Sequence, residues 1–210
     1  MTAPALPRPK KKRAGQYHHG DLRRALLEEA LRTIQAEGVE HLTLRAVGEK
    51  LGVSRTALYR HFSDKQALLA VVGREGFRML RQALTAALEQ HGRSREGFEA
   101  MGVAYVQFAV AHPSHYRVMF GRFIESCAKD AEFVQEATAA FQVLVDSLVE
   151  QQHAGLVRRD DPLMLARFIW SIVHGIAMLV IDGQLRGADE RGEALNQYAM
   201  DRIRDAITRV

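Results

Sequence analysis

Two short helices joined by a glycine turn constrain the fold of this chain more than any other feature of its sequence. The first is predicted over residues 44–51 and the second over residues 54–61. Thr43 and Ser54 stand at the two N-cap positions, and Gly52 stands where a helix can end in the left-handed conformation. Two short helices with a glycine turn between them are typical of the helix-turn-helix motif.

The second of these helices is rich in hydrogen-bond donors. Ala57 and Leu58 supply its apolar side, and most of its other residues are polar. In a helix-turn-helix, the second helix presents its N-terminal residues to the major groove, where arginine binds guanine and threonine contacts a base. Tyrosine hydroxyls and the starts of helices contact phosphates. The predicted DNA-contacting residues are Thr43, Ser54, Arg55, Thr56, Tyr59, Arg60, His61 and Lys65, of which His61 fits a packing role equally well.

The charge distribution divides the chain into two parts. Residues 1–65 contain 13 Lys and Arg against 7 Asp and Glu, whereas residues 66–210 contain 16 against 18. A basic first third followed by a nearly neutral remainder is typical of a head that binds a polyanion, joined to a separate body. Residues 1–16 hold three of the five prolines and the basic run Lys10–Arg13, which predicts a disordered arm. The arm either contacts DNA or is simply solvated.

The rest of the chain is predicted to be helical. Apolar residues recur at steps of three and four, and no segment has the alternation of a strand. Further helices are predicted over 21–36, 63–90, 98–112, 114–120, 133–155, 161–182 and 195–210. Gly73 and Gly76 weaken the second of these and allow a bend. The predicted fold class is all-α with about nine helices: a three-helix head at 17–65 and a helical body at 66–210.

Several other classes of protein are disfavoured. A single cysteine, Cys127, excludes an internal disulfide and fits a reducing compartment. The basic run follows the first apolar residues, so the start does not read as a secretory signal. The apolar stretch 168–181 is too short for a bilayer and is expected to be a buried core helix. Nucleophile–base pairs, phosphate loops and metal-ligand signatures are not evident. We therefore expect a cytoplasmic protein that is not an enzyme and uses no cofactor, metal or membrane.

Two segments of the body have the composition of a ligand pocket. Such a pocket needs mostly apolar walls with a few polar groups that fix orientation. Aromatic residues, methionines and histidines occur at helical spacing in both segments, although stripes of this kind more often belong to an ordinary core. The predicted effector pocket consists of Tyr105, Phe108, His112, Met119, Phe120, Phe123, Trp170, His174 and Met178.

The 168–181 segment is apolar on every side. One side is expected to face the core and the other to need a partner, for which a second copy of the chain is the simplest choice. The last helix would complete a four-helix interface about a two-fold axis. The alternative is that both helices pack within one subunit. The predicted dimer interface consists of Ile169, Ile172, Ile176, Val180, Leu195 and Ile203.

The stretch LTLRAVGEKLGVSRTALYRHFSDKQALL, residues 42–69, closely resembles the DNA-binding head of the tetracycline-repressor family of bacterial regulators. The residues that carry the resemblance are Thr43, Ala46, Val47, Gly52, Val53, Ser54, Leu58, Tyr59, His61, Phe62 and Lys65–Leu69. The segments HPSHYRVMF and WSIVHG, at 112–120 and 170–175, resemble a subgroup whose C-terminal domains carry Trp, His and Gly at this spacing. The resemblance implies an all-helical body for ligand binding and dimerisation.

These observations together predict a dimeric, bacterial, nucleoid-associated transcriptional regulator. We expect a repressor that binds a near-palindromic operator in double-stranded DNA and leaves it when an unknown small-molecule effector binds the body. The alternatives are a DNA-binding protein that responds to no effector and, with less support, a helical enzyme.

Overall fold

The computed structural model describes residues 19–92, 94–185, 187 and 189–208. Within these ranges it contains ten helices and no strand, so the all-α prediction is confirmed. The helices are α1 His19–Glu37, α2 Leu44–Lys50, α3 Arg55–His61, α4 Lys65–His91, α5 Arg95–Ala111, α6 Pro113–Phe120, α7 Ile124–Cys127, α8 Ala131–His153, α9 Pro162–Ile181 and α10 Glu193–Ile207. The helix that the sequence did not predict is α7, a single turn of four residues. The predicted basic arm lies outside the described residues.

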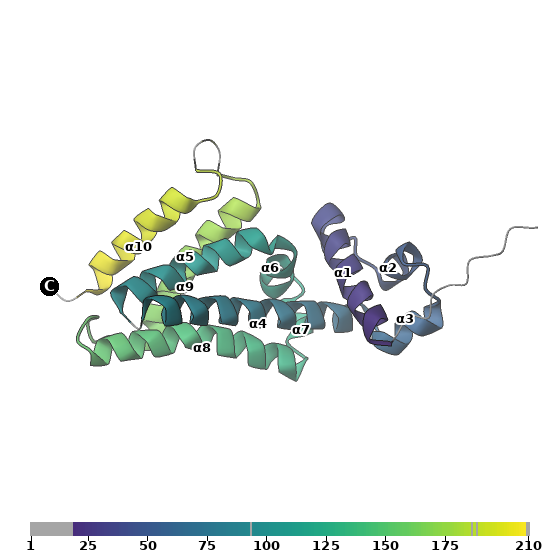
Figure 1. The fold of residues 1–210 in the computed structure, drawn as a ribbon, viewed down its shortest axis with the longest axis horizontal. Helices are drawn as coiled ribbons and strands as arrows, with labels where there is room; N and C mark the ends of the chain where they lie inside the picture. The colour runs from purple at the N-terminus through teal and green to yellow at the C-terminus, as the bar shows by residue number, and fades with distance from the viewer. Residues whose placement is uncertain (1–18, 93, 186, 188, 209–210) are drawn as a thin grey trace, which may run out of the picture.

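The helices form an elongated molecule with α2 and α3, two helices of seven residues each, at one end (Figure 1). We call α1–α3 the head and α4–α10 the body. Figure 1 shows that α4 runs from the head along the whole body with α8 beside it, and that α10 lies near the opposite end. Helices α5 and α9 pack against each other and against α10. Head and body touch where α1 meets α6 and the first turns of α4.

Two glycines of α4 serve close packing and do not interrupt the helix. Helix α4 is continuous over 27 residues, through both Gly73 and Gly76. A β-carbon at Gly73 would collide with the ring of Phe133 on α8, and one at Gly76 would collide with Met119 on α6. Two other helices therefore approach the backbone of α4 at positions where a larger residue has no room.

A proline separates α5 from α6. Helix α5 ends at Ala111, and Pro113 stands in the first turn of α6. Proline is tolerated there because the first N–H groups of a helix have no intrahelical partner to lose. The chain therefore turns sharply between two helices that both contribute to the site described below.

Helix α9 has one buried and one exposed apolar face within a single chain, so the expectation of a buried core helix holds for one of its sides only. It starts at Pro162, and its 20 residues are long and apolar enough to cross a membrane by those two criteria alone. Its inner face packs into the core of the body. The buried residues are Leu165, Ala166, Ile169, Val173, Ile176 and Ala177. On the outer face Met164 is 57% exposed and Phe168 is 48% exposed.

Candidate functional site

Side-chain caps fix the starts of both short helices of the head. The hydroxyl oxygen of Thr43 accepts a hydrogen bond of 3.1 Å from the Ala46 N–H, and that of Ser54 accepts one of 3.2 Å from the Ala57 N–H. Each bond satisfies one of the N–H groups that the first turn of a helix leaves unpaired. Between the helices, Gly52 has a φ of 64°, the left-handed conformation that glycine adopts without strain.

The turn is held by packing as well as by caps. The Val53 N–H donates to the Gly48 carbonyl at 3.0 Å, and Gly48 lies directly against the side chain of Leu58. Leu58 is 2% exposed, so α3 is anchored through its inner side. The Lys50 ammonium group of α2 reaches back to α1, where it donates to Glu37 at 3.0 Å. These contacts brace α3 against α2, and α2 against α1.

The outer side of α3 carries the predicted donors. Arg55, Thr56 and Arg60 are exposed, and Tyr59 is 51% exposed although it is aromatic. Their placement is what a helix that enters the major groove requires, and DNA contact by these side chains remains a prediction. Among the other predicted contacts, the capping residues Thr43 and Ser54 are exposed and His61 is half-buried.

Lys65 does not point away from the protein, which corrects the prediction of a phosphate contact. Its ammonium group donates to the carbonyl oxygens of Val39 at 2.7 Å and Glu40 at 3.1 Å, and lies 4.8 Å from the ring centroid of Phe123. Burial lowers the pKa of Lys65. The group is engaged in joining the loop after α1 to the start of the body.

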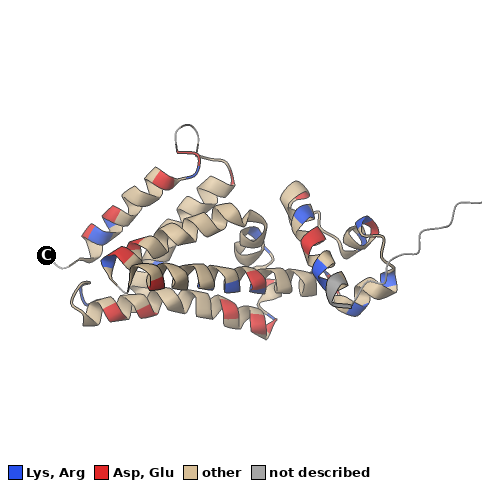
Figure 2. Cartoon of the chain, viewed as in Figure 1, with Lys and Arg blue, Asp and Glu red and all other residues tan. Residues whose placement is uncertain are grey.

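One residue of α2 joins the outer surface of α3. Arg45 is exposed, and together with Arg55 and Tyr59 it lines a shallow depression of about 250 Å³ between the two helices. Its guanidinium pairs with Glu49 at 2.7 Å on the same helix. Sequence reasoning missed Arg45, although the buried face formed by Leu44 and Val47 already indicated that Arg45 points away from it. Figure 2 shows Lys and Arg on the head helices and only acidic charges along α8.

The body encloses an apolar cavity of about 300 Å³, which we call the body cavity. Its walls come from α4, α5, α8 and α9, with further residues from α6, α7 and α10. The lining residues are Phe77, Leu80, Leu84, Phe98, Met101, Gly102, Tyr105, Phe120, Ile124, Ala137, Ala140, Phe141, Leu144, Arg167, Ile169, Trp170, Val173 and Met200. Tyr105, Phe120 and Trp170 are the residues of the predicted pocket that line it. The others were recognisable only as apolar stripes.

A chain of hydrogen bonds borders the body cavity. The Trp170 indole N–H donates to the Tyr105 hydroxyl oxygen at 3.0 Å, which lies 3.0 Å from the Tyr116 hydroxyl. The Tyr116 hydroxyl lies 2.6 Å from Nδ1 of His174. Burial lowers the pKa of His174, which favours the neutral ring, and Nδ1 accepts from Tyr116 in the tautomer that carries its proton at Nε2. Burial also raises the pKa of Tyr105 to about 12, so its hydroxyl keeps its proton.

The remaining predicted pocket residues lie elsewhere. Phe108 and His112 pack against each other with their rings tilted by 43° and 5.1 Å between ring centroids, and Met119 is fully buried against Gly76. These three residues do not line the body cavity, so their assignment to one pocket with Tyr105 and Trp170 is wrong. His174 lies behind Tyr105 and Trp170, where it ends the hydrogen-bond chain.

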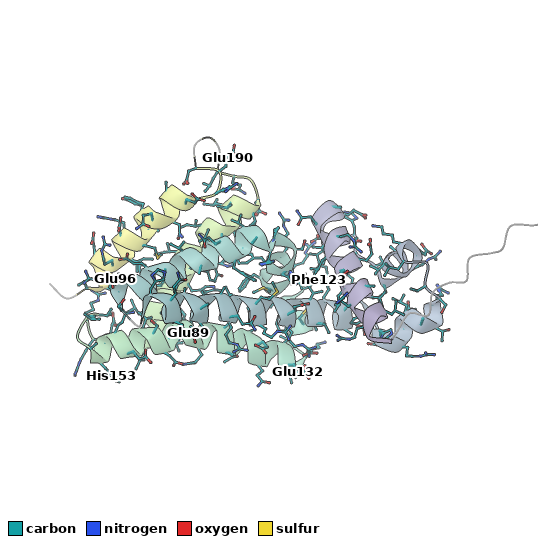
Figure 3. All side chains as sticks on the ribbon, in the orientation of Figure 1. Glu89, Glu96, Phe123, Glu132, His153 and Glu190 are labelled. Carbon is teal, nitrogen blue, oxygen red and sulfur yellow. The ribbon has the colours of Figure 1, made fainter. Side chains whose placement is uncertain are left out.

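Phe123 and Met178 line a second cavity of about 450 Å³, which we call the junction cavity because it lies between head and body. Phe123 is seen there next to α1 in Figure 3. Its walls are Ile34, Gln35, Gly38, Val39, Glu40, Tyr116, Arg117, Phe120, Gly121, Arg122, Phe123, Met178 and Asp182. Phe120 lines both cavities and therefore separates them.

Helix α6 joins the body cavity to the head. Phe120, at its C-terminal end, belongs to the cavity wall. Tyr116, in the middle of the helix, belongs to the hydrogen-bond chain. Ser114, at its start, lies 3.2 Å from the Leu31 carbonyl oxygen and 3.0 Å from Oε1 of Gln35, both on α1. Helix α6 therefore contacts both the wall of the body cavity and the head.

The predicted dimer interface needs correction. Ile169, Ile176 and Ile203 are at most 5% exposed within a single chain, so they form the core and cannot meet a partner. Ile172, Val180 and Leu195 are half-buried. The apolar residues that α9 exposes are Leu163, Met164, Phe168 and Leu179. The helical period correctly indicated two apolar faces, but three of the six residues assigned to the partner belong to the core.

Across the part of the chain that the structure describes, no group of three or more His, Cys, Asp or Glu side chains is arranged to hold a metal ion. The site is therefore described by two features: a braced helix with outward donors in the head, and an apolar cavity connected to that head through α6.

The comparisons with known proteins agree with this architecture. A family model described as the tetracyclin repressor-like C-terminal domain matches residues 98–203, and one described as bacterial regulatory proteins of the tetR family matches residues 26–72. The HTH-type transcriptional repressor AcnR of Corynebacterium diphtheriae is 25% identical over 191 residues, 88% of each chain. The uncharacterized HTH-type transcriptional regulator YobS of Bacillus subtilis is 24% identical over 77% of this chain and 80% of its own.

A solved protein of unknown function from Rhodococcus sp. RHA1 has a TM-score of 0.81 and 34% identity, and the match covers 92% of this chain and 98% of that one. Members of the matched family are bacterial transcriptional regulators, not enzymes. Membership in a family of bacterial transcription regulators implies a cytoplasmic location. Such regulators bind DNA and generally act as dimers with small-molecule effectors. The matched segments include the braced helix and most of the cavity walls, and the chain belongs to the tetR family of bacterial regulatory proteins.

Proposed function

We propose that the chain is a homodimeric repressor that binds a near-palindromic operator through α3 and is released from it by a ligand of the body cavity. The observation that carries the proposal is the outer side of α3, where four exposed donors stand on a helix braced from behind. The description of AcnR as a transcriptional repressor supports the direction of regulation. Association with the nucleoid follows from such binding.

The donors divide into two groups by their chemistry. Arg55 and Thr56 occupy the first turn of α3, from which a recognition helix reaches base edges. A guanidinium binds O6 and N7 of guanine in a bidentate manner, and each such pair discriminates by about 1–3 kcal/mol. Tyr59 and Arg60 lie further along and suit phosphate oxygens. Arg45 on α2 is added to the residues proposed to contact phosphates. The hydroxyls of Thr43 and Ser54 can also donate to phosphates while they accept from the backbone.

The proposed dimer forms through the exposed face of α9. Met164, Phe168 and Leu179 recur there at helical spacing, and a contiguous apolar face of this kind is what a stable partner surface requires. Tyr198 on α10, which is 63% exposed, adds an aromatic residue of the kind that is enriched in interfaces. A two-fold axis at this face would present two α3 helices to successive major grooves, about 34–36 Å apart.

Helix α6 is proposed to couple ligand binding in the body cavity to release of the operator DNA by the head. A ligand in the body cavity contacts Phe120, and α6 carries this contact to Ser114 and α1. The ligand shifts the equilibrium only if it binds the DNA-free arrangement more tightly, typically by about 1–3 kcal/mol. We also place the chain in the subgroup with Trp, His and Gly at this spacing, because Trp170 and His174 both belong to the hydrogen-bond chain beside the cavity.

Selection of bound DNA from a random pool tests the proposed function. We expect an enriched near-palindrome whose half-sites are centred one helical turn apart or slightly more. A pool that shows no enrichment would contradict base reading by α3. An enriched site without two-fold symmetry would retain base reading and contradict the dimer.

A further inference from the structure

We propose that the body cavity selects an apolar molecule with a single carboxylate, and that Arg167 at the mouth of the cavity binds that carboxylate. This inference rests on the proposed function, since it names the class of effector that the cavity takes. Among the described lining residues, Arg167 is the one that carries a charge, and the others are almost all apolar.

Arg167 has the position for this role, and its guanidinium pairs with no acidic side chain in the part of the chain that the structure describes. It lies on α9 three residues before Trp170, a lining residue on the same side of the helix, and it is exposed. Its Nη1 lies 4.0 Å from the sulfur of Met164, and among the described residues it pairs with no carboxylate. A guanidinium keeps its charge at any physiological pH and binds a carboxylate through two parallel hydrogen bonds.

The inner wall offers no competing site for an anion. The Tyr105 hydroxyl accepts from Trp170 and has its one proton within reach of two acceptors, the Tyr116 oxygen and Nδ1 of His174. Tyr116 in turn lies closest to Nδ1 of His174. The Trp170 N–H is already used by Tyr105, and with Nδ1 of His174 unprotonated each hydroxyl proton has an acceptor inside the protein, so neither group offers a free donor to a carboxylate. The anion is therefore expected at Arg167 and the hydrocarbon inside.

The same wall disfavours two other classes of ligand. A cationic molecule would meet the like charge of Arg167, and the described lining contains no Asp or Glu to offset that repulsion. An amino acid or another zwitterion would leave its ammonium group without an anion. A buried unpaired charge is costly, so the lining selects against both. The volume of about 300 Å³ is at the lower end of the range for small-molecule pockets.

Trp170 provides the measurement. It is the single tryptophan of the chain and lines the cavity, so its fluorescence reports on occupancy. We would titrate the full-length protein with decanoate, decan-1-ol and decylammonium, which share one tail and differ in the head group. We expect decanoate to bind at least about tenfold more tightly than the alcohol, the gain expected from a charge-assisted contact, and decylammonium to bind most weakly.

Variants separate the head-group contact from the tail. Arg167→Gln should remove the preference for decanoate and leave the affinity for decan-1-ol unchanged, while Arg167→Lys should keep part of it. Arg202→Gln, at an exposed arginine of α10 that pairs with Asp205 at 2.9 Å, is the control and should change neither affinity. The proposal is overturned if the acid and the alcohol bind equally, if Arg167→Gln weakens both equally, or if none of the three ligands alters the fluorescence.

The release of DNA separates this inference from the proposed function. With the selected operator in a gel shift, decanoate should release the wild-type protein at a lower concentration than decan-1-ol, and Arg167→Gln should abolish the difference. Operator binding with equal release by acid and alcohol would refute the carboxylate preference alone. Absence of any selected operator would refute the proposed function, while the fluorescence titration would still decide the ligand class.

Discussion

The ammonium group of Lys65, at the start of α4, donates a hydrogen bond of 2.7 Å to the carbonyl oxygen of Val39, which follows α1. A second bond reaches Glu40, and the ring of Phe123 lies beneath the charge. One side chain therefore joins three segments: the end of the first helix, the start of the longest helix and the turn after α6. A lysine in this position stabilises the joint between head and body.

Replacement of Lys65 by Met should therefore lower stability and leave the electrostatics of DNA binding unchanged. We expect the free energy of unfolding to fall by about 1 kcal/mol, because two carbonyl groups lose a charged donor that is only partly shielded from water. The logarithmic salt dependence of operator binding should keep the wild-type slope. Arg60→Met is the comparison, and there the slope should decrease by about one unit. A reduced slope for Lys65→Met would restore this residue to the phosphate-binding set.

Substitution of Arg55 by Ala tests base reading. The variant should lose about 1–3 kcal/mol of binding free energy on the selected operator, and its preference at one base pair should relax. Binding to random DNA should fall far less, because the phosphate contacts of Tyr59, Arg60 and Arg45 remain. Competition gel shifts measure both quantities in one experiment. Equal losses on operator and random DNA would mean that Arg55 contacts phosphate.

The sequence predicted the parts of the head that depend on neighbours in the chain. Thr43, Ser54 and Gly52 act through hydrogen bonds and backbone angles within four residues, so their residue types reveal the geometry. Lys65 has the same local signature as a phosphate-binding residue. Its actual partners, Val39 and Glu40, lie about 25 positions earlier in the chain, and nothing in the local pattern identifies them.

Sequence reasoning was less successful in the body, for a physical reason. Phe168 and Ile169 are adjacent and similarly apolar, yet the first is 48% exposed and the second 3%. Tyr105 and Phe108 lie three positions apart on α5, but only Tyr105 reaches the body cavity. Periodicity identifies an apolar helix face. It does not identify which neighbouring helix covers that face or where the packing leaves a void.

The exposed face of α9 gives a prediction about assembly. Met164→Asp combined with Phe168→Asp should yield a folded monomer in sedimentation velocity, because two charges would be placed where a partner is proposed. Leu156→Asp, at a residue that is 40% exposed outside this face, should leave the dimer intact. By contrast Ile176→Asp should unfold the chain, since that residue is 5% exposed in the core. A double variant that still sediments as a dimer would exclude this face.

Gly73 gives a prediction about packing. Gly73→Ala should lower the free energy of unfolding by about 1–3 kcal/mol, because its new methyl group meets the ring of Phe133. Urea denaturation of this variant, of Phe133→Leu and of the double variant forms a thermodynamic cycle. The loss in the double variant should be smaller than the sum of the single losses, since leucine frees the space that alanine needs. Strict additivity would show that the destabilisation arises elsewhere.

Protonation of His174 should weaken the body as the pH falls. Burial lowers the pKa of His174 in the folded chain, whereas the unfolded chain has the ordinary value of about 6.5. The unfolded state therefore binds more protons below about pH 6.5, so the free energy of unfolding decreases as the pH falls through that value towards the lower folded pKa. Protonation at Nδ1 also removes the acceptor for the Tyr116 hydroxyl, 2.6 Å away.

Urea denaturation between pH 8 and 5 should show this loss of stability, and His174→Gln should reduce it because the amide does not titrate. His115 retains its own contribution in that variant, since burial lowers its pKa as well. A pH profile identical to that of the wild type would mean that His174 does not change its protonation on unfolding.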